Sequence, residues 1–256
     1  MSAEDRAFDD ENERRAMVEP ALLEGARVDD VIVLPREVAH YFTRVLRLKD
    51  GQEVSLLDGQ GRVVDGALVT VDAPGVRVRA ARVVLDPLPP LVVYQALVRG
   101  AKLDEVVQRA TELGADRVVV FRAERSNVPA TAYKFDRLAR IAHDATRQSR
   151  RTRALRVSGV LTLAQVCDEL ARVDAPTLVC VVGAPRAASG VLADDTRTRT
   201  RGARFVIGPE GGLTDDERAL LVAAGATPCA LGAHVLRTET AGLAALAAAQ
   251  AALGAL

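Results

Sequence analysis

Residues 204–253 read RFVIGPEGGLTDDERALLVAAGATPCALGAHVLRTETAGLAALAAAQAAL and contain two glycine-marked turns. The first turn, GPEGG at residues 208–212, follows a short apolar run at 205–207. The second turn, LGAHVLRTET at residues 231–240, follows the run at 228–230. If the two runs are neighbouring parallel strands, both turns lie at the carboxyl ends of strands, where open α/β sheets bind ligands. The stretch therefore predicts a small-molecule pocket.

The segments before this stretch alternate between strand and helix patterns. An apolar run at residues 91–98 predicts a strand buried on both faces, and an amphipathic pattern at 103–113 predicts a helix that ends before Gly114. This alternation predicts a mostly parallel α/β sheet. The other expected elements are strands at 117–121 and 177–182, helices at 135–149 and 162–172, and a polar surface loop at 183–202. Thr162 followed by Gln165 predicts a capping box at the start of the second of these helices.

The amino-terminal part shows short strand patterns at roughly ten-residue spacing, which suggest a small barrel. Strands are expected at 31–34, 53–57, 63–71 and 76–85, and a short helix at 35–48 carries Val38, Phe42, Val45 and Leu46 on one side. The proline-rich residues 86–90 predict a stiff linker. The expected organisation is a disordered acidic tail at 1–16, a barrel domain at 17–85, the linker at 86–90 and an α/β domain at 91–256.

Composition excludes several classes of protein. The 34 basic and 34 acidic residues balance, so any attraction to nucleic acid must come from local patches. The three cysteines lack CxxC spacing, and His40, His143 and His234 lack ligand spacing, so no metal site is expected. The amino terminus has no apolar signal region, and no segment is apolar enough to span a membrane. We expect a cytoplasmic protein.

The first turn favours a nucleoside ligand. Gly208, Gly211 and Gly212 permit close backbone approach, and Pro209 stiffens the turn. Such a pocket can hold a ligand by main-chain hydrogen bonds and apolar contacts to its ring. The spacing matches neither GxGxxG nor a Walker A loop, so neither a dinucleotide nor ATP is expected. A plain structural turn is the alternative. Thr214 followed by Glu217 predicts a capping box and hence the start of the next helix.

The second turn places polar residues before the last helix pattern. Thr238 or Thr240 can cap that helix. Arg237 is harder to explain by capping, because a cation is unfavourable at a helix amino terminus. We therefore expect Arg237 to face an anion or a polarised substrate oxygen.

A basic stripe points to RNA. Residues 137–156 contain seven Arg and one Asp. Four of these arginines recur with Asp144 at helical spacing: Arg137, Arg140, Arg147 and Arg151. This concentration suits phosphate contacts. A solvated helix face with ion pairs to the acidic tail is the alternative.

These motifs together resemble the ribosomal RNA small subunit methyltransferase E family, which are 16S rRNA uridine-N3 methyltransferases of the SPOUT superfamily. The resemblance is carried by GPEGG-L-T-x-x-E and LG-x-x-V-L-R-T-E-T-A, with FTRVLRLKDG at 42–51, KLDEVVQRATELG at 102–114, ERS at 124–126 and QSxR at 148–151. His234, Arg147 and Leu213 depart from the usual Arg, Glu and Phe of the family.

The resemblance implies a SPOUT α/β domain with a deep trefoil knot, preceded by a PUA-like barrel that binds RNA. It implies S-adenosylmethionine as cofactor without a metal, 16S rRNA or the 30S subunit as partner, a homodimer and no membrane. Arg237, Glu239 and Glu210 are predicted to be catalytic, with either glutamate accepting the uridine N3 proton or ordering the loop.

The residues predicted to hold the cofactor lie in three segments: Val182, Gly183, Ile207, Gly208, Pro209, Glu210, Gly211, Gly212, Leu231, Gly232, Val235, Leu236, Thr238, Thr240 and Ala241. The residues predicted to contact RNA are Arg44, Arg47, Lys102, Arg125, Arg140, Arg147, Gln148 and Arg151.

Two other functions remain open on sequence grounds. The chain could be a SPOUT enzyme with a different RNA target, such as a ribose 2′-OH. It could also be a non-catalytic RNA-binding or ribosome assembly factor, although the intact glycine turns and Arg237 weigh against this.

Overall fold

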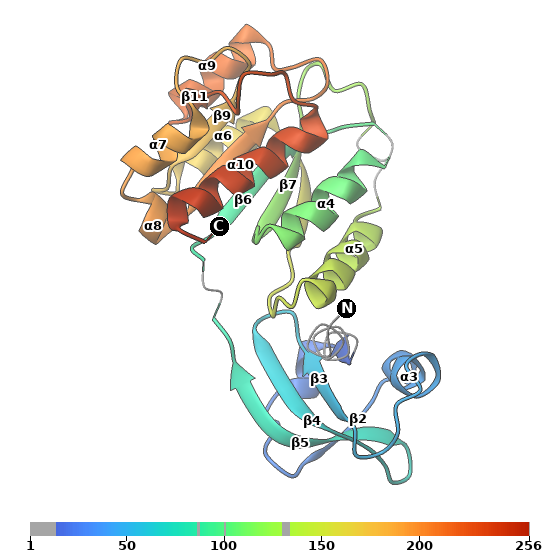
Figure 1. The fold of residues 1–256 in the computed structure, drawn as a ribbon. Helices are drawn as coiled ribbons and strands as arrows, with labels where there is room; N and C mark the ends of the chain where they lie inside the picture. Colours follow the sequence, from blue (N-terminus) through green and yellow to red (C-terminus); the bar gives the residue numbers. More distant parts are fainter. Residues whose placement is uncertain (1–13, 86–87, 100, 130–133, 256) are drawn as a thin grey trace. The chain divides into compact units, whose positions relative to one another are not determined.

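The computed structural model describes residues 14–85, 88–99, 101–129 and 134–255 (Figure 1). The described chain divides into two compact units. The first contains the residues up to 85 together with Thr146–Ala154, and the second contains the rest. Residues 1–13 of the expected tail lie outside the described residues, whereas residues 15 and 16 lie in the first strand.

The first unit is built on a five-stranded sheet in the order β1-β3-β4-β5-β2. β1 pairs with β3 in parallel, and the other neighbours are antiparallel. Phe42, Leu23 and Leu56 are fully buried in its core. The strands are β1 (Arg15–Met17), β2 (Val31–Val33), β3 (Glu53–Leu57), β4 (Arg62–Thr70) and β5 (Pro74–Val83), and the helices are α2 (Pro20–Leu23), α3 (Arg36–His40) and η1 (Tyr41–Val45).

One expectation for this unit was wrong. Val45 was assigned to the inward side of a helix, but its side chain is 58% exposed. The helix passes from α3 into the π-type turn η1, where Leu46 N donates to Tyr41 O. A wider turn rotates the residues that follow it, so the helical spacing no longer predicts the buried face.

The second unit is built on a six-stranded parallel sheet in the order β11-β9-β10-β6-β7-β8 (Figure 1). The strands are β6 (Leu91–Ala96), β7 (Arg117–Arg122), β8 (Arg156–Thr162), β9 (Thr177–Cys180), β10 (Ala203–Ile207) and β11 (Thr227–Cys229). This confirms the predicted α/β class. The two strands that precede the glycine turns are not neighbours, however, because β9 lies between them.

Helices cover both faces of this sheet, as its alternating apolar side chains require. Val93 and Phe205 pack against α4, α7 and α10 on one face, while Val119 and Val206 pack against α6 and α9 on the other. The helices are α4 (Lys102–Glu112), α5 (Phe135–Gln148), α6 (Leu163–Ala171), α7 (Ala188–Asp194), α8 (Thr198–Arg201), α9 (Asp215–Ala223) and α10 (Thr238–Leu253).

Sequence patterns predicted the starts of two helices correctly, but the prediction of a loop at 183–202 was wrong. The capping boxes at Thr162 and Thr214 are confirmed, each with its reciprocal hydrogen bonds. The predicted loop contains α7 and α8 instead. Ala188, Val191 and Leu192 form a short buried helical face there, and polar residues around it conceal the pattern.

Within the described residues, no helix is both long and apolar enough to cross a bilayer.

Candidate functional site

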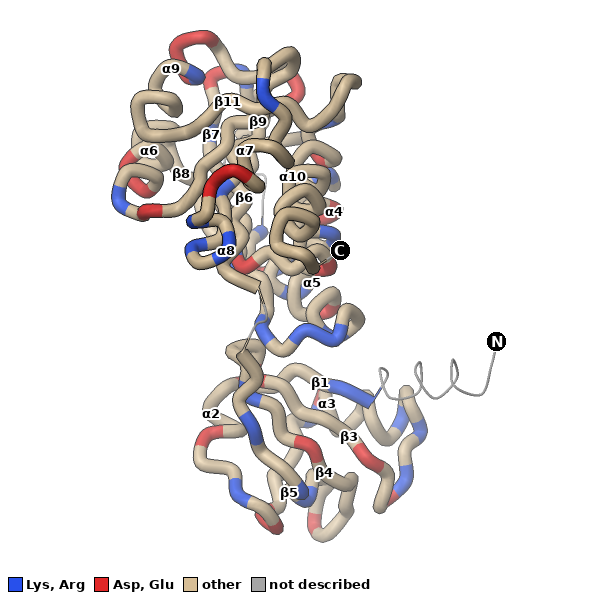
Figure 2. Tube along the Cα trace, turned by 60° about the vertical axis from the view of Figure 1, so that its left-hand side comes forward, with Lys and Arg blue, Asp and Glu red and all other residues tan. Residues whose placement is uncertain are grey.

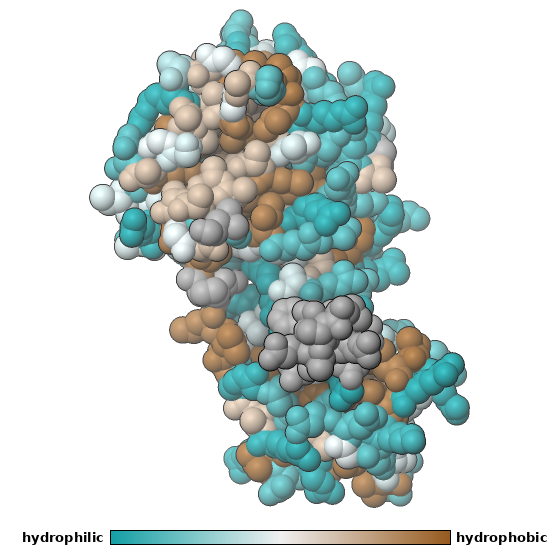
Figure 3. Space-filling model, in the orientation of Figure 1, coloured by the Kyte–Doolittle hydropathy of each residue, from teal (hydrophilic) through white to brown (hydrophobic). Residues whose placement is uncertain are grey.

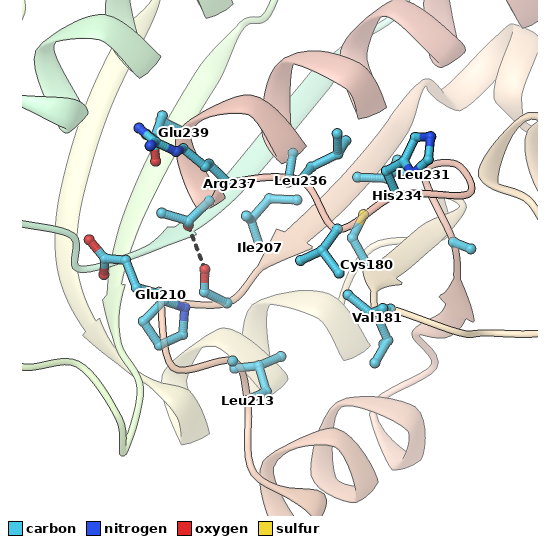
Figure 4. Close-up of a pocket in the computed structure, with 18 of the residues that line it drawn as sticks. Cys180, Val181, Ile207, Glu210, Leu213, Leu231, His234, Leu236, Arg237 and Glu239 are labelled. Carbon is cyan, nitrogen blue, oxygen red and sulfur yellow. Dashed lines mark hydrogen bonds and ion pairs between the residues drawn. The ribbon is translucent and has the colours of Figure 1, made fainter.

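A cavity of about 710 Å³ lies in the second unit, at the carboxyl ends of β9, β10 and β11 (Figure 4). Its walls are the segments that follow these three strands and the first turn of α10. Parallel strands end at the same edge of a sheet, so three segments distant in sequence meet here. The sheet therefore places both glycine turns around one cavity, although β9 separates their strands.

The first glycine turn is held rigidly on both sides. A Cβ on Gly208 would lie 3.1 Å from Leu213 Cγ, so the turn has little room for a side chain there. After the turn, Thr214 Oγ1 accepts from Glu217 N at 3.3 Å, and Glu217 Oε2 accepts from Thr214 N at 2.9 Å. Glu217 is buried, and its Oε1 also accepts from Glu124 N at 2.7 Å. The loop therefore starts from a fixed strand and ends at a fixed helix.

The second turn differs from the expectation that a threonine caps α10. The residue at the cap position is Arg237, which has extended backbone and no capping side chain. Thr238 is instead buried and donates its hydroxyl hydrogen to Gly208 O at 2.6 Å, the contact drawn as a dashed line in Figure 4. Thr238 thus joins the second turn to the first.

Arg237 projects from the start of α10 with its side chain 82% exposed. Its Nη1 lies 3.7 Å from Glu239 Oε1. This distance permits an electrostatic attraction but no close hydrogen bond. The guanidinium is therefore available at the cavity rim.

Lys102, at the start of α4, lies between the two glutamates of the site. Its Nζ donates to Glu210 Oε1 at 3.0 Å and lies 3.5 Å from Glu239 Oε2. Glu210 Oε1 also accepts from Arg99 N at 3.3 Å. Glu239 is the more enclosed carboxylate, because its side chain is 10% exposed whereas that of Glu210 is 40% exposed.

These contacts change the acidity of the pair. Burial alone would raise the pKa of Glu210, but hydrogen bonds from its own backbone, from Lys102 and from Arg99 N together lower it. The hydrogen bond to Glu210 raises the pKa of Lys102. Glu210 is therefore ionised and held by a cation, which makes it a poor proton acceptor.

Cys180 lines the cavity, and its Sγ lies 3.9 Å from the Sγ of buried Cys229 on the adjacent strand. Its contact with Cys229 and its burial raise the pKa of the Cys180 thiol. In the part of the chain that the structure describes, no three His, Cys, Asp or Glu side chains are grouped as a metal site would need.

Comparisons with known proteins agree with this architecture. Residues 86–250 match the family model described as RNA methyltransferase domain, and residues 34–80 match the model described as RNA methyltransferase PUA domain. A ribosomal RNA small subunit methyltransferase E from a Synechocystis species is 32% identical over 86% of this chain and 73% of its own length. The chain belongs to the ribosomal RNA small subunit methyltransferase E family.

Other members of this methyltransferase family are similar along most of their length. The family member from Mycobacterium tuberculosis is 31% identical over 85% of both chains. A crystal structure of the family member from Neisseria gonorrhoeae, bound to S-adenosyl methionine, aligns with a TM-score of 0.77 at 25% identity. That alignment covers 93% of this chain and 97% of the other.

The cavity brings together most of the residues that the methyltransferase family resemblance had assigned to the cofactor. Gly183, Gly211 and Thr240 do not line it. Six residues that were not predicted also line the cavity: Cys180, Val181, Leu213, Arg218, Ala230 and His234. Cys180 and Val181 reach it because β9 lies between the two strands that precede the glycine turns. The predicted residues that line the cavity are Val182, Ile207, Gly208, Pro209, Glu210, Gly212, Leu231, Gly232, Val235, Leu236, Thr238 and Ala241, together with Arg237 and Glu239.

Of the residues assigned to RNA, Lys102 lines the cavity and Arg125 contacts the first glycine turn. Arg125 donates from Nη1 to Gly211 O at 3.0 Å, so Arg125 supports the first turn from outside.

The expected helical stripe is confirmed in part, because Arg137, Arg140 and Arg147 lie on α5 at the predicted spacing. Helix α5 ends at Gln148, so Arg151 lies beyond it. Arg137 pairs with Asp104 at 2.7 Å, and Arg147 packs over the Tyr41 ring at 5.0 Å. Arg140 on α5 is exposed, as are Gln148 at its end and Arg44 and Arg47 in the first unit.

Proposed function

We propose that this chain is an S-adenosylmethionine-dependent methyltransferase that methylates N3 of a specific uridine in 16S rRNA. The observation that carries the proposal is the cavity that both glycine turns enclose at the carboxyl edge of the sheet. The named family members act on small-subunit ribosomal RNA, and the member from Neisseria gonorrhoeae binds S-adenosyl methionine.

The residues present fit this cofactor. A cavity of about 710 Å³ is in the size range of a nucleoside-sized ligand. Ile207, Leu231 and Leu236 offer apolar surface for a purine ring, and the glycine turns offer backbone groups for its polar edge. No metal is required for this role. When bound, S-adenosylmethionine supplies a methyl group that the sulfonium already activates.

The chain's own residues then position the uracil and handle its proton. The N3 proton must leave so that the nitrogen lone pair can form the new bond to carbon. Glu239 is the stronger candidate for accepting that proton, because the hydrogen bonds that lower the pKa of Glu210 make Glu210 a weaker base. Arg237, at the rim, stabilises the negative charge that develops on a uracil carbonyl oxygen. Glu210 orders the loop.

Methylation of rRNA from a strain that lacks the endogenous enzyme tests the activity. We expect mass spectrometry to locate one new methyl group on a uridine N3 in 16S rRNA or 30S subunits. A methyl group at a ribose 2′-OH would overturn the target, and failure of the folded protein to bind S-adenosylmethionine in calorimetry would favour a non-catalytic factor. Arg237→Ala should keep the cofactor affinity and lose most turnover, because Arg237 is exposed at the rim.

We further propose the domain roles. Residues 17–85 form a PUA-like barrel that binds RNA, 86–90 form the linker and 91–256 form the SPOUT methyltransferase domain; the PUA match at residues 34–80 supports the first of these. Exposed Arg44, Arg47 and Arg140, with the basic run after α5 that Figure 2 draws in blue, supply phosphate contacts. An enzyme with this substrate works in the cytoplasm.

The knot and the homodimer are also proposals. The segment from Leu231 onward returns to pack α10 against α4, α7, β6 and β10, which suits a chain end threaded through a deep trefoil knot. Small apolar residues gather over α10 in Figure 3, which suits close packing against a second copy. A crystal structure would test the threading, and light scattering that gave a monomer would contradict the dimer.

A further inference from the structure

Gln95 is a buried amide in an otherwise apolar part of β6. Its side chain is fully buried, and it lies on the same face of the strand as Leu91, Val93 and Leu97. Gln95 interrupts the apolar run at 91–98, and the strand is still buried on both faces as predicted. A buried amide is costly unless its hydrogen bonds are satisfied, so its contacts explain why the strand can hold it.

The amide reaches the cofactor site through one hydroxyl. Gln95 Nε2 donates to Thr238 Oγ1 at 2.9 Å and also lies 3.2 Å from Ala96 O. Thr238 Oγ1 in turn donates to Gly208 O at 2.6 Å. The hydroxyl has one hydrogen, which goes to the carbonyl, so it must accept from the amide. This fixes the direction of the chain from Gln95 to Thr238 to Gly208.

The same contacts fix the orientation of the amide. Both groups near Nε2 require a donor, so a flipped amide would place its oxygen against two acceptors. Gln95 Oε1 is consequently left buried with no hydrogen-bond partner among the described residues. A side chain that served stability alone would gain from losing this oxygen, because an unsatisfied buried acceptor destabilises the fold.

The register of the sheet explains where the relay acts. Gln95 pairs with Ile207 across β6 and β10, one residue before Gly208 begins the first glycine turn. Thr238 is the first residue of α10, at the end of the second turn. Gln95 therefore connects the two turns from the buried interior of the domain.

We propose that Gln95 is a positioning residue for methyl transfer, which sets through Thr238 the orientation of the Gly208 carbonyl in the cavity wall. This inference rests on the proposed function, since it assumes that the cofactor occupies this cavity. The relay holds the first turn in the shape that binds the cofactor, and Gln95 contributes to it without lining the cavity.

Gln95→Met is the direct test, because methionine has similar length and removes both the donor and the unsatisfied oxygen. We expect the melting temperature to stay the same or rise, while the dissociation constant for S-adenosylmethionine, measured by calorimetry, rises roughly tenfold, the equivalent of one lost hydrogen bond. We expect turnover to fall with it, and KM for RNA to stay unchanged. A purely structural glutamine would not give this combination.

Gln250→Met is the matched control. Gln250 is a buried glutamine of α10 whose Nε2 donates to Leu113 O at 2.6 Å, and it does not line the cavity. Its substitution should lower the melting temperature and leave the cofactor affinity unchanged. Equal loss of cofactor affinity in both variants would overturn the proposal, because the effect would then follow from any damage to α10.

Thr238 gives a second test that does not depend on the folding of Gln95→Met. Thr238→Val removes the hydroxyl and should weaken cofactor binding. Thr238→Ser keeps the hydroxyl and should bind the cofactor as the wild type does. Cofactor binding within twofold of wild type in Thr238→Val or Gln95→Met would overturn the relay. If the folded wild type itself fails to bind S-adenosylmethionine, the proposed function fails instead, so the two failures are distinguishable.

Discussion

Lys102 Nζ donates to Glu210 Oε1 at 3.0 Å, and this contact joins the start of α4 to the first glycine turn. Glu239 Oε2 lies 3.5 Å from the same Lys102 Nζ. One cation thus contacts two carboxylates at the edge of the cavity. The arrangement allows Glu210 and Glu239 to have different roles, because Glu210 accepts the closer hydrogen bond from Lys102 while Glu239 is the more enclosed carboxylate.

Removing this cation should change the pH dependence of the enzyme. In Lys102→Met the two carboxylates lose their counter-charge, so we expect the acidic limb of the pH–rate profile to move to higher pH. Stability should change by less than about 1 kcal/mol, because the pair is partly exposed. Arg109→Met removes a cation of α4 that pairs with Glu112 away from the cavity, and it should leave the profile unchanged. An unshifted limb in Lys102→Met would contradict this role.

Glu210 should also contribute to acid stability. Its pKa in the folded protein lies below the ordinary value of 4.5, so its contribution is present above about pH 4.5 and is lost as the pH falls through the lowered pKa. The pKa of Lys102 is raised from 10.5, so its contribution is present below about pH 10.5 and is lost as the pH rises through the raised value.

The difference in melting temperature between wild type and Glu210→Gln should therefore be constant from about pH 6 to 9 and shrink below about pH 4.5. Its size corresponds to less than about 1 kcal/mol, since the Glu210 side chain is 40% exposed. Calorimetric scans of both proteins across this range provide the measurement. A difference that grew on acidification would have the wrong sign.

Short-range signals predicted the second unit well, because they depend on neighbouring residues. The capping boxes at Thr162 and Thr214 fixed two helix starts, and the apolar runs located β6, β7, β9 and β10. Strand order depends on contacts between distant segments, so the position of β9 between β10 and β11 was not predictable from spacing. β8 was missed because Ser158 and Gly159 interrupt its pattern.

The functional site shows the same contrast between local sequence signals and contacts that join distant residues. Both glycine turns were identified from sequence, and the cavity contains them. The contacts among Lys102, Glu210 and Glu239 were not predictable, because they join residues more than a hundred positions apart. Lys102 was assigned to RNA without knowledge of these contacts, and Thr238 was assigned to the cofactor and, with Thr240 as the alternative, to the cap of α10. Gln95 carried a usable signal, since a glutamine within an apolar strand requires a buried partner.

Two glycines of the second unit should respond in opposite ways to alanine. Gly202 has φ +74°, and a Cβ there would meet Pro90 O at 1.8 Å, so Gly202→Ala should destabilise the fold by more than about 2 kcal/mol. Gly242 lies inside α10, where a Cβ would meet Val93 Cγ1 at an ordinary 3.4 Å. Gly242→Ala should stabilise by up to about 1 kcal/mol, because alanine favours the helix. Urea unfolding measures both effects, and equal changes in stability would contradict these differences in contact.

RNA binding should depend on salt through the exposed arginines and not through those already packed in the fold. Arg140 is exposed on α5, so Arg140→Ala should reduce the slope of log K against log salt by about 0.7–0.9, the value for one lost phosphate contact. Arg147 is half-buried over the Tyr41 ring, so Arg147→Ala should lower the melting temperature as well. Titrations of 16S rRNA fragments at several salt concentrations, with scans of the free proteins, separate the two. If Arg140→Ala left the slope unchanged, α5 would not be part of the RNA surface.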